Sequence, residues 1–239
     1  FRSPPTGGVA TYVKNFMELS SAQEKCIITL WRTGKKDRNT NNVFQVVVDL
    51  SLILKYMVTC TCKDIDVVHI HTASYWSFIR NVPYVIISKV FSKSKVVLHV
   101  HGGEFDVFFA ESSKVLKQVI RYIIQSSDAV IVTSPVWIPI LQRIGDTYNS
   151  IYAVPNGYVS TDFYPIDTMT ARTELNLPRD RKVILTVGGL EPVKGPKYLL
   201  EAVQKIIPER KDILCVIVGA GELRIALERQ ISLLGLEDY

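Results

Sequence analysis

The fold class of this 239-residue chain is decided by the stretch VILTVGGLEPVKG at residues 183–195. Its apolar, β-branched run Val183–Val187 predicts a buried strand, and the two glycines that follow predict a tight turn. An amphipathic stretch from Pro196 to Ile207 comes next and predicts a helix, with proline at its first position. A strand that leads through a short turn into a helix is the repeating unit of a parallel sheet.

The same alternation of short apolar runs and longer amphipathic stretches extends along the chain. Further helices are predicted at Val9–Ser20, Lys114–Gln125 and Glu222–Leu234. The predicted strands are Cys26–Leu30, Phe44–Val48, Val67–His71, Val96–His101, Ala129–Thr133, Ile151–Val154, Val183–Val187 and Leu214–Val218. We therefore expect an α/β protein with parallel sheets that carry helices on both faces.

A connector in the second half of the chain predicts two domains. Periodicity fades between Pro155 and Arg181, where prolines, a glycine and charges cluster. We place a first Rossmann-like domain at residues 1–165 and a second at 166–239. A glycine turn so close to the start leaves no room for a preceding strand, and the second domain has only two predicted strands. We expect a chain truncated at both ends, with the second domain cut short at Tyr239.

Composition limits the classes of function. The chain has 28 Lys and Arg against 23 Asp and Glu, a net charge of +5 without blocks of like charge. Such a balance would suit anionic substrates or a membrane surface but is specific for neither. We expect no nucleic-acid partner. No apolar run approaches the roughly 18 residues that a membrane span requires. The four cysteines lack zinc-knuckle spacing, and reduced thiols fit a cytoplasmic protein.

All four histidines lie at the ends of two predicted strands, as His69 and His71 and as His99 and His101. Alternate strand residues share a face, so either pair has the geometry to ligate a metal. We expect no metal site, because no carboxylate or cysteine lies at a matching strand end. Ligands gather at the carboxyl ends of parallel strands, and His101 precedes the open turn Gly102–Gly103, so His101 is the favoured ligand contact.

Three glycine-containing turns precede helices and favour bound phosphate, because backbone N–H groups at a helix N-terminus attract anions. The first is Gly7–Gly8, and the second carries Lys194 as a point charge. The third contains Gly219 and Gly221 and is similar to a dinucleotide fingerprint, but Arg224 stands where its third glycine belongs. Taken alone, each turn is better explained as an ordinary tight turn or surface loop.

Taken in order, these segments resemble the family 4 retaining glycosyltransferases, which have the GT-B fold of two Rossmann-like domains. No single segment is decisive, but six in the order of the family are far more specific than one. They are Gly7-Gly8-Val9 with its helix, Val97–Gly102, Asp128–Ser134, Val154–Gly157, Leu185–Leu190 with Lys194-Gly195, and Val218–Gly221.

The resemblance implies transfer of a sugar from a nucleotide-diphosphate donor, a UDP- or GDP-sugar, with retention of configuration and without metal or cofactor. Backbone dipoles and basic side chains would stabilise the leaving diphosphate. By this resemblance Gly7 and Gly8 face the donor phosphates, His101 contacts the sugar near its reacting carbon, and Lys194 pairs with the diphosphate. The loop residues Gly219 and Gly221 line the nucleotide side.

One position departs from the family pattern. An arginine is usual where this chain has Gly189, and losing one of two cations would cost about 3–4 kcal/mol of transition-state stabilisation. The glutamate pair that holds sugar and ribose in the family would lie beyond Tyr239. We therefore expect residues 1–239 by themselves to be inactive.

Two alternatives to a transferase stay open. One is a GT-B sugar-nucleotide epimerase, against which the Lys194-Gly195 turn argues mildly. The other is a non-catalytic or degenerate nucleotide-binding protein, which Gly189 favours. The resemblance also implies a sugar or lipid-linked acceptor, a cytoplasmic location and, by analogy, peripheral contact with the inner face of a membrane.

Overall fold

A computed structural model describes residues 8–18, 24–33, 42–147 and 150–239 of the chain. It divides into two compact units, unit 1 at Phe1–Phe163 and unit 2 at Tyr164–Tyr239. Each unit contains a parallel sheet, so the predicted α/β architecture is confirmed.

Unit 1 is built on a four-stranded parallel sheet with the strand order β1-β2-β3-β4. The strands are β1 (Val67–Thr72), β2 (Lys95–Val100), β3 (Ala129–Val132) and β4 (Ile151–Ala153). Helix α4 (Trp76–Phe91) connects β1 to β2, α5 (Phe105–Glu111) and α6 (Lys114–Ser126) connect β2 to β3, and α7 (Trp137–Gly145) connects β3 to β4. Parallel neighbours need such crossovers, which cover the sheet and bury its central strands.

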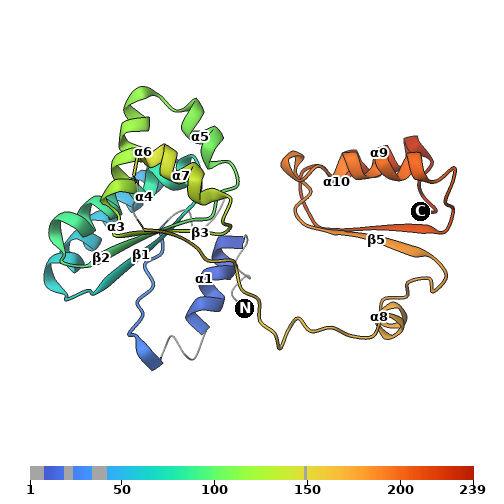
Figure 1. Ribbon diagram of the computed structural model, residues 1–239, viewed down its shortest axis with the longest axis horizontal. Helices are drawn as coiled ribbons and strands as arrows, with labels where there is room; N and C mark the ends of the chain where they lie inside the picture. Colours follow the sequence, from blue (N-terminus) through green and yellow to red (C-terminus); the bar gives the residue numbers. More distant parts are fainter. Residues whose placement is uncertain (1–7, 19–23, 34–41, 148–149) are drawn as a thin grey trace. The chain divides into compact units, whose positions relative to one another are not determined.

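The core of unit 1 lies between this sheet and its helices. On β2 the side chains of Val96, Leu98 and Val100 are almost fully buried. Helix α6 contributes Ile120, Ile123 and Ile124, whose i, i+3, i+4 spacing places them on one buried stripe. Figure 1 shows α6 and α7 on one face of the sheet and α1 (Gly8–Glu18) on the other.

The carboxylate of Asp128 connects β2 to β3 at the amino end of the sheet. Asp128 accepts hydrogen bonds from the backbone N–H of Val96 at 2.8 Å, from Lys89 Nζ at 2.9 Å and from Lys95 Nζ at 3.1 Å. These donors, with the Val96 N–H first, hold the pKa of Asp128 well below its usual range. The side chain of Asp128 thus fixes the start of both central strands.

The predicted strand at Phe44–Val48 is wrong, because these residues belong to the helix α3 (Asn42–Cys62). The β-branched run at its start favoured a strand, but a longer periodicity decides the structure. Ile53, Tyr56, Met57 and Cys60 follow the spacing i, i+3, i+4, i+7 and pack on the core of unit 1. Burial of that helical stripe overrides the local preference of a few valines.

The predicted strand at Cys26–Leu30 is also wrong, since these residues are in no strand of the described chain. Ile27 is fully exposed there. A strand needs a hydrogen-bonded neighbour, and the described residues provide none for this segment.

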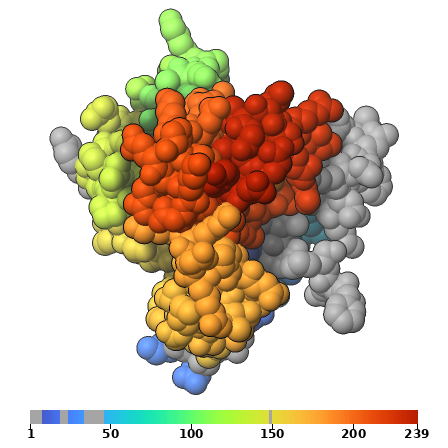
Figure 2. All heavy atoms as spheres, turned by 90° about the vertical axis from the view of Figure 1, so that its right-hand side faces the viewer, coloured from blue at the N-terminus to red at the C-terminus, as the bar shows by residue number. Residues whose placement is uncertain are grey.

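Unit 2 has a two-stranded parallel sheet of β5 (Lys182–Val187) and β6 (Ile213–Val218). It also contains the helices α8 (Thr168–Glu174), α9 (Pro196–Ile206) and α10 (Arg224–Leu234) and the 3-10 turn η1 (Pro192–Lys194). Leu190, Leu200, Val203, Leu227 and Leu236 form its core. Helices α9 and α10 lie together on one face of the sheet in Figure 1 and form the orange-to-red surface in Figure 2.

The other face of this small sheet is open. Leu185 and Val187 on β5 are 61% and 70% exposed, as expected of alternate residues that point away from α9 and α10. The predicted helices at Pro196–Ile207 and Glu222–Leu234 match α9 and α10 within two residues. No helix in the described part of the chain is long and apolar enough to cross a membrane.

Candidate functional site

The four histidines meet on one face of the unit 1 sheet. Strands β1 and β2 are neighbours, and their parallel register places His71 opposite His99. Across the strand pair, His69 Nε2 lies 3.2 Å from His99 Nδ1, and His71 Nδ1 lies 3.0 Å from His101 Nε2. Two predicted pairs therefore form a single cluster of four imidazole rings.

Helix α1 contacts this cluster on the face of the sheet opposite α6 and α7 (Figure 1). The ring centroid of Tyr12 lies 5.1–5.5 Å from those of His71, His99 and His101. One turn later, Phe16 makes an edge-on contact with His69 at 6.2 Å. Tyr12 and Phe16 are four residues apart and therefore lie on the same side of α1, but periodicity alone does not say which side chains they meet.

The environment keeps the cluster uncharged at neutral pH. Burial, reinforced by repulsion from the neighbouring imidazoles, lowers the pKa of His71 and His99 to about 3 and that of His101 to about 4. Burial also lowers the pKa of His69. Neutral imidazoles both donate and accept hydrogen bonds, which the two ring-to-ring bonds require.

The buried Asn81 of α4 is a further part of this site that sequence reasoning missed. Its Nδ2 donates to the backbone carbonyl of His71 at 2.9 Å. A lone asparagine inside an apolar helical pattern is the signal that could have indicated it, because a buried amide needs partners. Asn81 fixes the end of β1 and with it the position of His71.

At the carboxyl edge of the same sheet, His101 follows the last residue of β2. Its N–H donates to the carbonyl of Thr72 at 2.8 Å, so the ladder continues to this residue. A Cβ on the next residue, Gly102, would lie 2.7 Å from Ser74 Oγ and 3.1 Å from Ser74 N. The glycine is therefore required by the close approach of two loops, and the half-buried His101 lies beside them.

Of the first predicted glycine turn, Gly7 lies outside the described residues. Gly8 is the first residue of α1, and nothing lies within 4 Å of a Cβ built on it. The roles of Gly7 and Gly8 toward donor phosphates stay predictions.

In unit 2, two glycine loops pack against each other at the carboxyl ends of β5 and β6. The N–H of Gly188 donates to the carbonyl of Val218, and the N–H of Leu190 donates to that of Ala220, both at 3.0 Å. A Cβ on Gly219 would collide with the Gly188 carbonyl, and one on Gly221 with the backbone of Leu190. Backbone packing thus accounts for both glycines, whether or not they also line a nucleotide.

Lys194 is exposed at the end of the η1 turn, directly before α9. Gly195 follows with a φ of 64°, a left-handed conformation that favours glycine, and it is the N-cap of α9. The turn therefore places a cation beside a helix N-terminus at the carboxyl edge of the sheet. Both features attract an anion.

Gly189 leaves room for the side chain that the family pattern would place there. A Cβ built on it would lie 3.4 Å from Glu191 Cδ, an ordinary van der Waals contact. The absence of the arginine is thus a feature of this sequence and is not imposed by the packing of unit 2.

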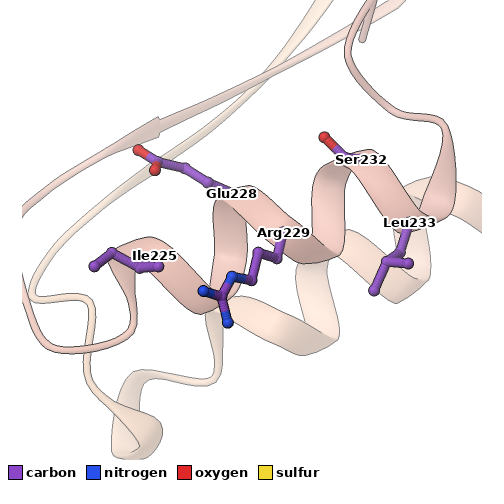
Figure 3. A pocket seen from close by; sticks show the side chains of 5 residues that line it. All are labelled: Ile225, Glu228, Arg229, Ser232 and Leu233. Atoms are coloured by element: carbon purple, nitrogen blue, oxygen red, sulfur yellow. The ribbon is translucent and has the colours of Figure 1, made fainter.

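An open pocket of about 540 Å³ lies along α10 in unit 2 (Figure 3). It is lined by Ile225, Glu228, Arg229, Ser232 and Leu233, all on that helix. None of the residues predicted from the sequence to bind a donor lines it. The pocket and the glycine loops are therefore different features of unit 2.

The chain is thus an α/β protein with the GT-B fold. Sucrose-phosphate synthase from Thermosynechococcus elongatus superposes with a TM-score of 0.65 at 19% identity, over 83% of this chain and 50% of that one. Anabaena Alr3699/HepE in complex with UDP gives 0.59 at 20% identity, over 79% and 50%. At these identities the likeness concerns the fold.

The second unit of the chain matches a family of glycosyltransferases. Residues 167–239 match the model of the family described as "Glycosyl transferases group 1". YtcC of Bacillus subtilis (strain 168), named as a glycosyltransferase, is 26% identical over 167 residues, 66% of this chain and 37% of YtcC. A D-inositol 3-phosphate glycosyltransferase from Nocardioides sp. is 39% identical over 74 residues, 30% of this chain and 16% of that protein. The chain thus spans a minor part of the length of these relatives.

Proposed function

We propose that the protein carrying this chain is a retaining glycosyltransferase that moves a sugar from a nucleotide-diphosphate donor to an acceptor. The observation that carries the proposal is the turn with exposed Lys194 and left-handed Gly195 before α9. It lies within the stretch that matches the family model. Such a turn suits a diphosphate, because it combines a mobile point charge with a helix N-terminus.

In the proposed reaction, negative charge develops on the leaving diphosphate as its bond to the sugar breaks. Lys194 and the N–H groups at the start of α9 stabilise that charge, and we propose that Gly8 at the start of α1 also contacts the donor phosphates. His101, whose pKa of about 4 keeps it neutral, forms a hydrogen bond to the sugar near the reacting carbon. Gly219 and Gly221 line the nucleotide side.

A UDP-sugar is the first donor to test, with GDP-sugars next. Two solved structures of Alr3699/HepE, at 20% identity to this chain, are complexes with UDP and with UDP-glucose. The acceptor is a glycan, a small molecule or a lipid-linked sugar. A lipid-linked acceptor would place the protein in the cytoplasm, in peripheral contact with the membrane, and sedimentation with anionic vesicles tests that contact.

The test uses the intact protein and measures binding of UDP and GDP by calorimetry and transfer from a panel of nucleotide sugars. Lys194→Ala should weaken nucleoside-diphosphate binding at least tenfold, because a hydrogen bond to a charged group contributes about 1.5–3 kcal/mol. Lys205→Ala, an exposed lysine in the last turn of α9, is the matched control and should bind normally. A protein that neither binds a nucleoside diphosphate nor turns over any donor would refute the proposal.

A second candidate function is nucleotide binding without transfer. Gly189 favours it, because a site with one cation in place of two holds a diphosphate but stabilises its developing charge less well. Binding of UDP or GDP together with absence of transfer would identify this alternative. Epimerised donor formed without any acceptor would identify a sugar-nucleotide epimerase instead.

A further inference from the structure

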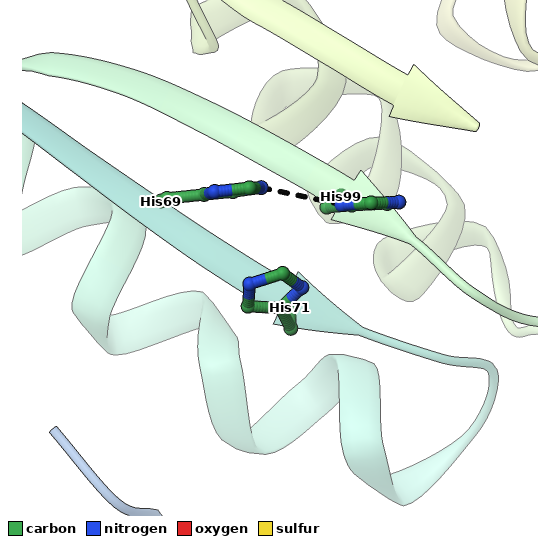
Figure 4. Close-up of side chains that lie close together, drawn as sticks. All are labelled: His69, His71 and His99. Atoms are coloured by element: carbon green, nitrogen blue, oxygen red, sulfur yellow. Dashed lines mark hydrogen bonds between the residues drawn. The ribbon is translucent and has the colours of Figure 1, made fainter. Parts of the chain in front are cut away.

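We propose that His69, His71 and His99 form a binding site for a divalent transition-metal ion such as Zn²⁺. One ring nitrogen from each residue lies within 4.8 Å of those from the other two. Figure 4 shows the three rings gathered between β1 and β2, with His69 and His71 on one strand and His99 on the other. The proposal is independent of the glycosyltransferase function.

The backbone of the sheet brings the three ligands together. His69 and His71 alternate along β1 and so point to the same face, and the register of β1 and β2 sets His99 opposite His71. The sequence argument against a metal considered each strand separately and found two ligands on each. Pairing of the strands supplies the missing third ligand from the neighbouring strand.

The distances are close to what an ion requires. Zinc binds imidazole nitrogen at about 2.0–2.1 Å, so nitrogens around a tetrahedral ion lie roughly 3.3–3.4 Å apart. His69 Nε2 and His99 Nδ1 are already separated by 3.2 Å. The ligand atoms of the three residues lie within 4.8 Å of one another, so rotation of the His71 side chain can complete the set while Asn81 holds the His71 carbonyl in place.

The chemistry of the donors selects the class of ion. Imidazole ligands suit zinc, copper, nickel and cobalt, whereas calcium and magnesium prefer oxygen. His99 contributes its Nδ1, the nitrogen that lies 3.2 Å from His69 Nε2, and its ring is fully buried. Three histidines leave a fourth position for water.

The experiment exploits the fact that the chain has four histidines, all of them in this cluster. The chain, prepared without a histidine tag, is titrated with Co²⁺ and Zn²⁺ alone. We expect one ion per chain and, for Co²⁺, the strong visible absorption of four- or five-fold coordination. His69→Gln and His71→Gln should each weaken binding at least tenfold, while circular dichroism verifies that both variants are folded.

Two controls separate this site from other ligands. The exposed thiols Cys26 and Cys62 are removed together as Cys26→Ser and Cys62→Ser, and that variant should bind normally. His101→Gln should also retain the ion, because His101 is outside the set of three. Binding that survives both His69→Gln and His71→Gln, or that is lost with the cysteines or with His101, would overturn the assignment.

A second measurement needs no variant. In the wild-type chain, proton magnetic resonance resolves the histidine ring protons, and one equivalent of Co²⁺ should shift or broaden the signals of at least three rings. Unchanged histidine signals at one equivalent, or the absence of any stoichiometric binding, would refute the site.

Discussion

At the scale of single residues, position 189 decides how much positive charge the proposed donor site holds. Gly189 stands five residues before Lys194, and the packing around it leaves a side chain free to extend. The carboxylate of Glu191 lies beside the same position, so a cation placed there would have a partner in the absence of nucleotide. The residue therefore affects charge without being needed for the fold of the loop.

Gly189→Arg should tighten binding of UDP or GDP about tenfold, equal to roughly 1.4 kcal/mol. The new guanidinium adds a second cation, besides the Lys194 ammonium, that faces the diphosphate. Calorimetry of the intact protein at two salt concentrations measures the change, which should shrink as salt rises. Gly188→Arg is the matched control, since a Cβ there meets nothing within 4 Å among the described residues. Equal affinity gains from both variants would show a non-specific effect of charge and contradict the prediction.

At the scale of secondary-structure elements, the pairing of β2 with β3 depends on a side chain at the start of β3. Asp128 accepts from the backbone of Val96 and from two lysines, and its side chain is 23% exposed. The carboxylate takes the place of a backbone acceptor for the Val96 N–H at the start of the two strands. It also links the strands that carry the histidine cluster to the rest of the sheet.

Asp128→Asn should lower the free energy of unfolding of unit 1 by about 1–2 kcal/mol at neutral pH, since it removes the charge from three hydrogen bonds. The pKa of Asp128 is depressed in the folded state. Its contribution is therefore complete above the unfolded pKa of about 3.9 and is lost as the pH falls further. The difference between variant and wild type should accordingly narrow below about pH 4.

Urea unfolding followed by tryptophan fluorescence measures this difference. The exposed Asp64, in the turn before β1, provides the control Asp64→Asn, which should change stability little. An Asp128→Asn variant as stable as wild type at pH 7, or a difference that grows on acidification, would contradict the role of the carboxylate.

Most of the strands, but not all of them, were predictable from the sequence. Six of the eight predicted strands have counterparts within about a residue, because buried parallel strands have apolar, β-branched runs that are hard to mistake. The strand predicted at Phe44–Val48 is wrong, because its valines lie at the start of a helix. The buried stripe of that helix can be recognised in the sequence only from Ile53 onward. Local preference and helical burial disagreed there, and burial decided.

For the site, alternation along β1 and β2 predicted that histidines on each strand share a face. Which strands are neighbours, and therefore that His69 approaches His99, depends on long-range pairing that no local pattern contains. The contacts of Tyr12 with the rings have the same origin, because they join a helix to strands more than fifty residues away in the sequence. The assignment of donor-binding roles to the glycines and Lys194 stays a prediction.

At the scale of the whole molecule, the described residues contain two separate hydrophobic cores, one in each unit. Leu141 on α7 is fully buried in the first, and Leu200 on α9 is 3% exposed in the second. The segment between β4 and α8 is almost entirely exposed, including Tyr158 and Phe163. Few buried contacts along a connector are typical of a boundary between units that unfold separately.

The three tryptophans, Trp31, Trp76 and Trp137, all belong to unit 1, so their fluorescence reports the unfolding of that unit. Leu141→Ala should lower the urea midpoint of the fluorescence transition, because a cavity at a buried leucine costs about 2–5 kcal/mol. Leu200→Ala should leave that midpoint unchanged and instead reduce hydrogen-exchange protection of amides in α9 and β6. A fluorescence midpoint that falls equally in both variants would contradict separate unfolding of the two units.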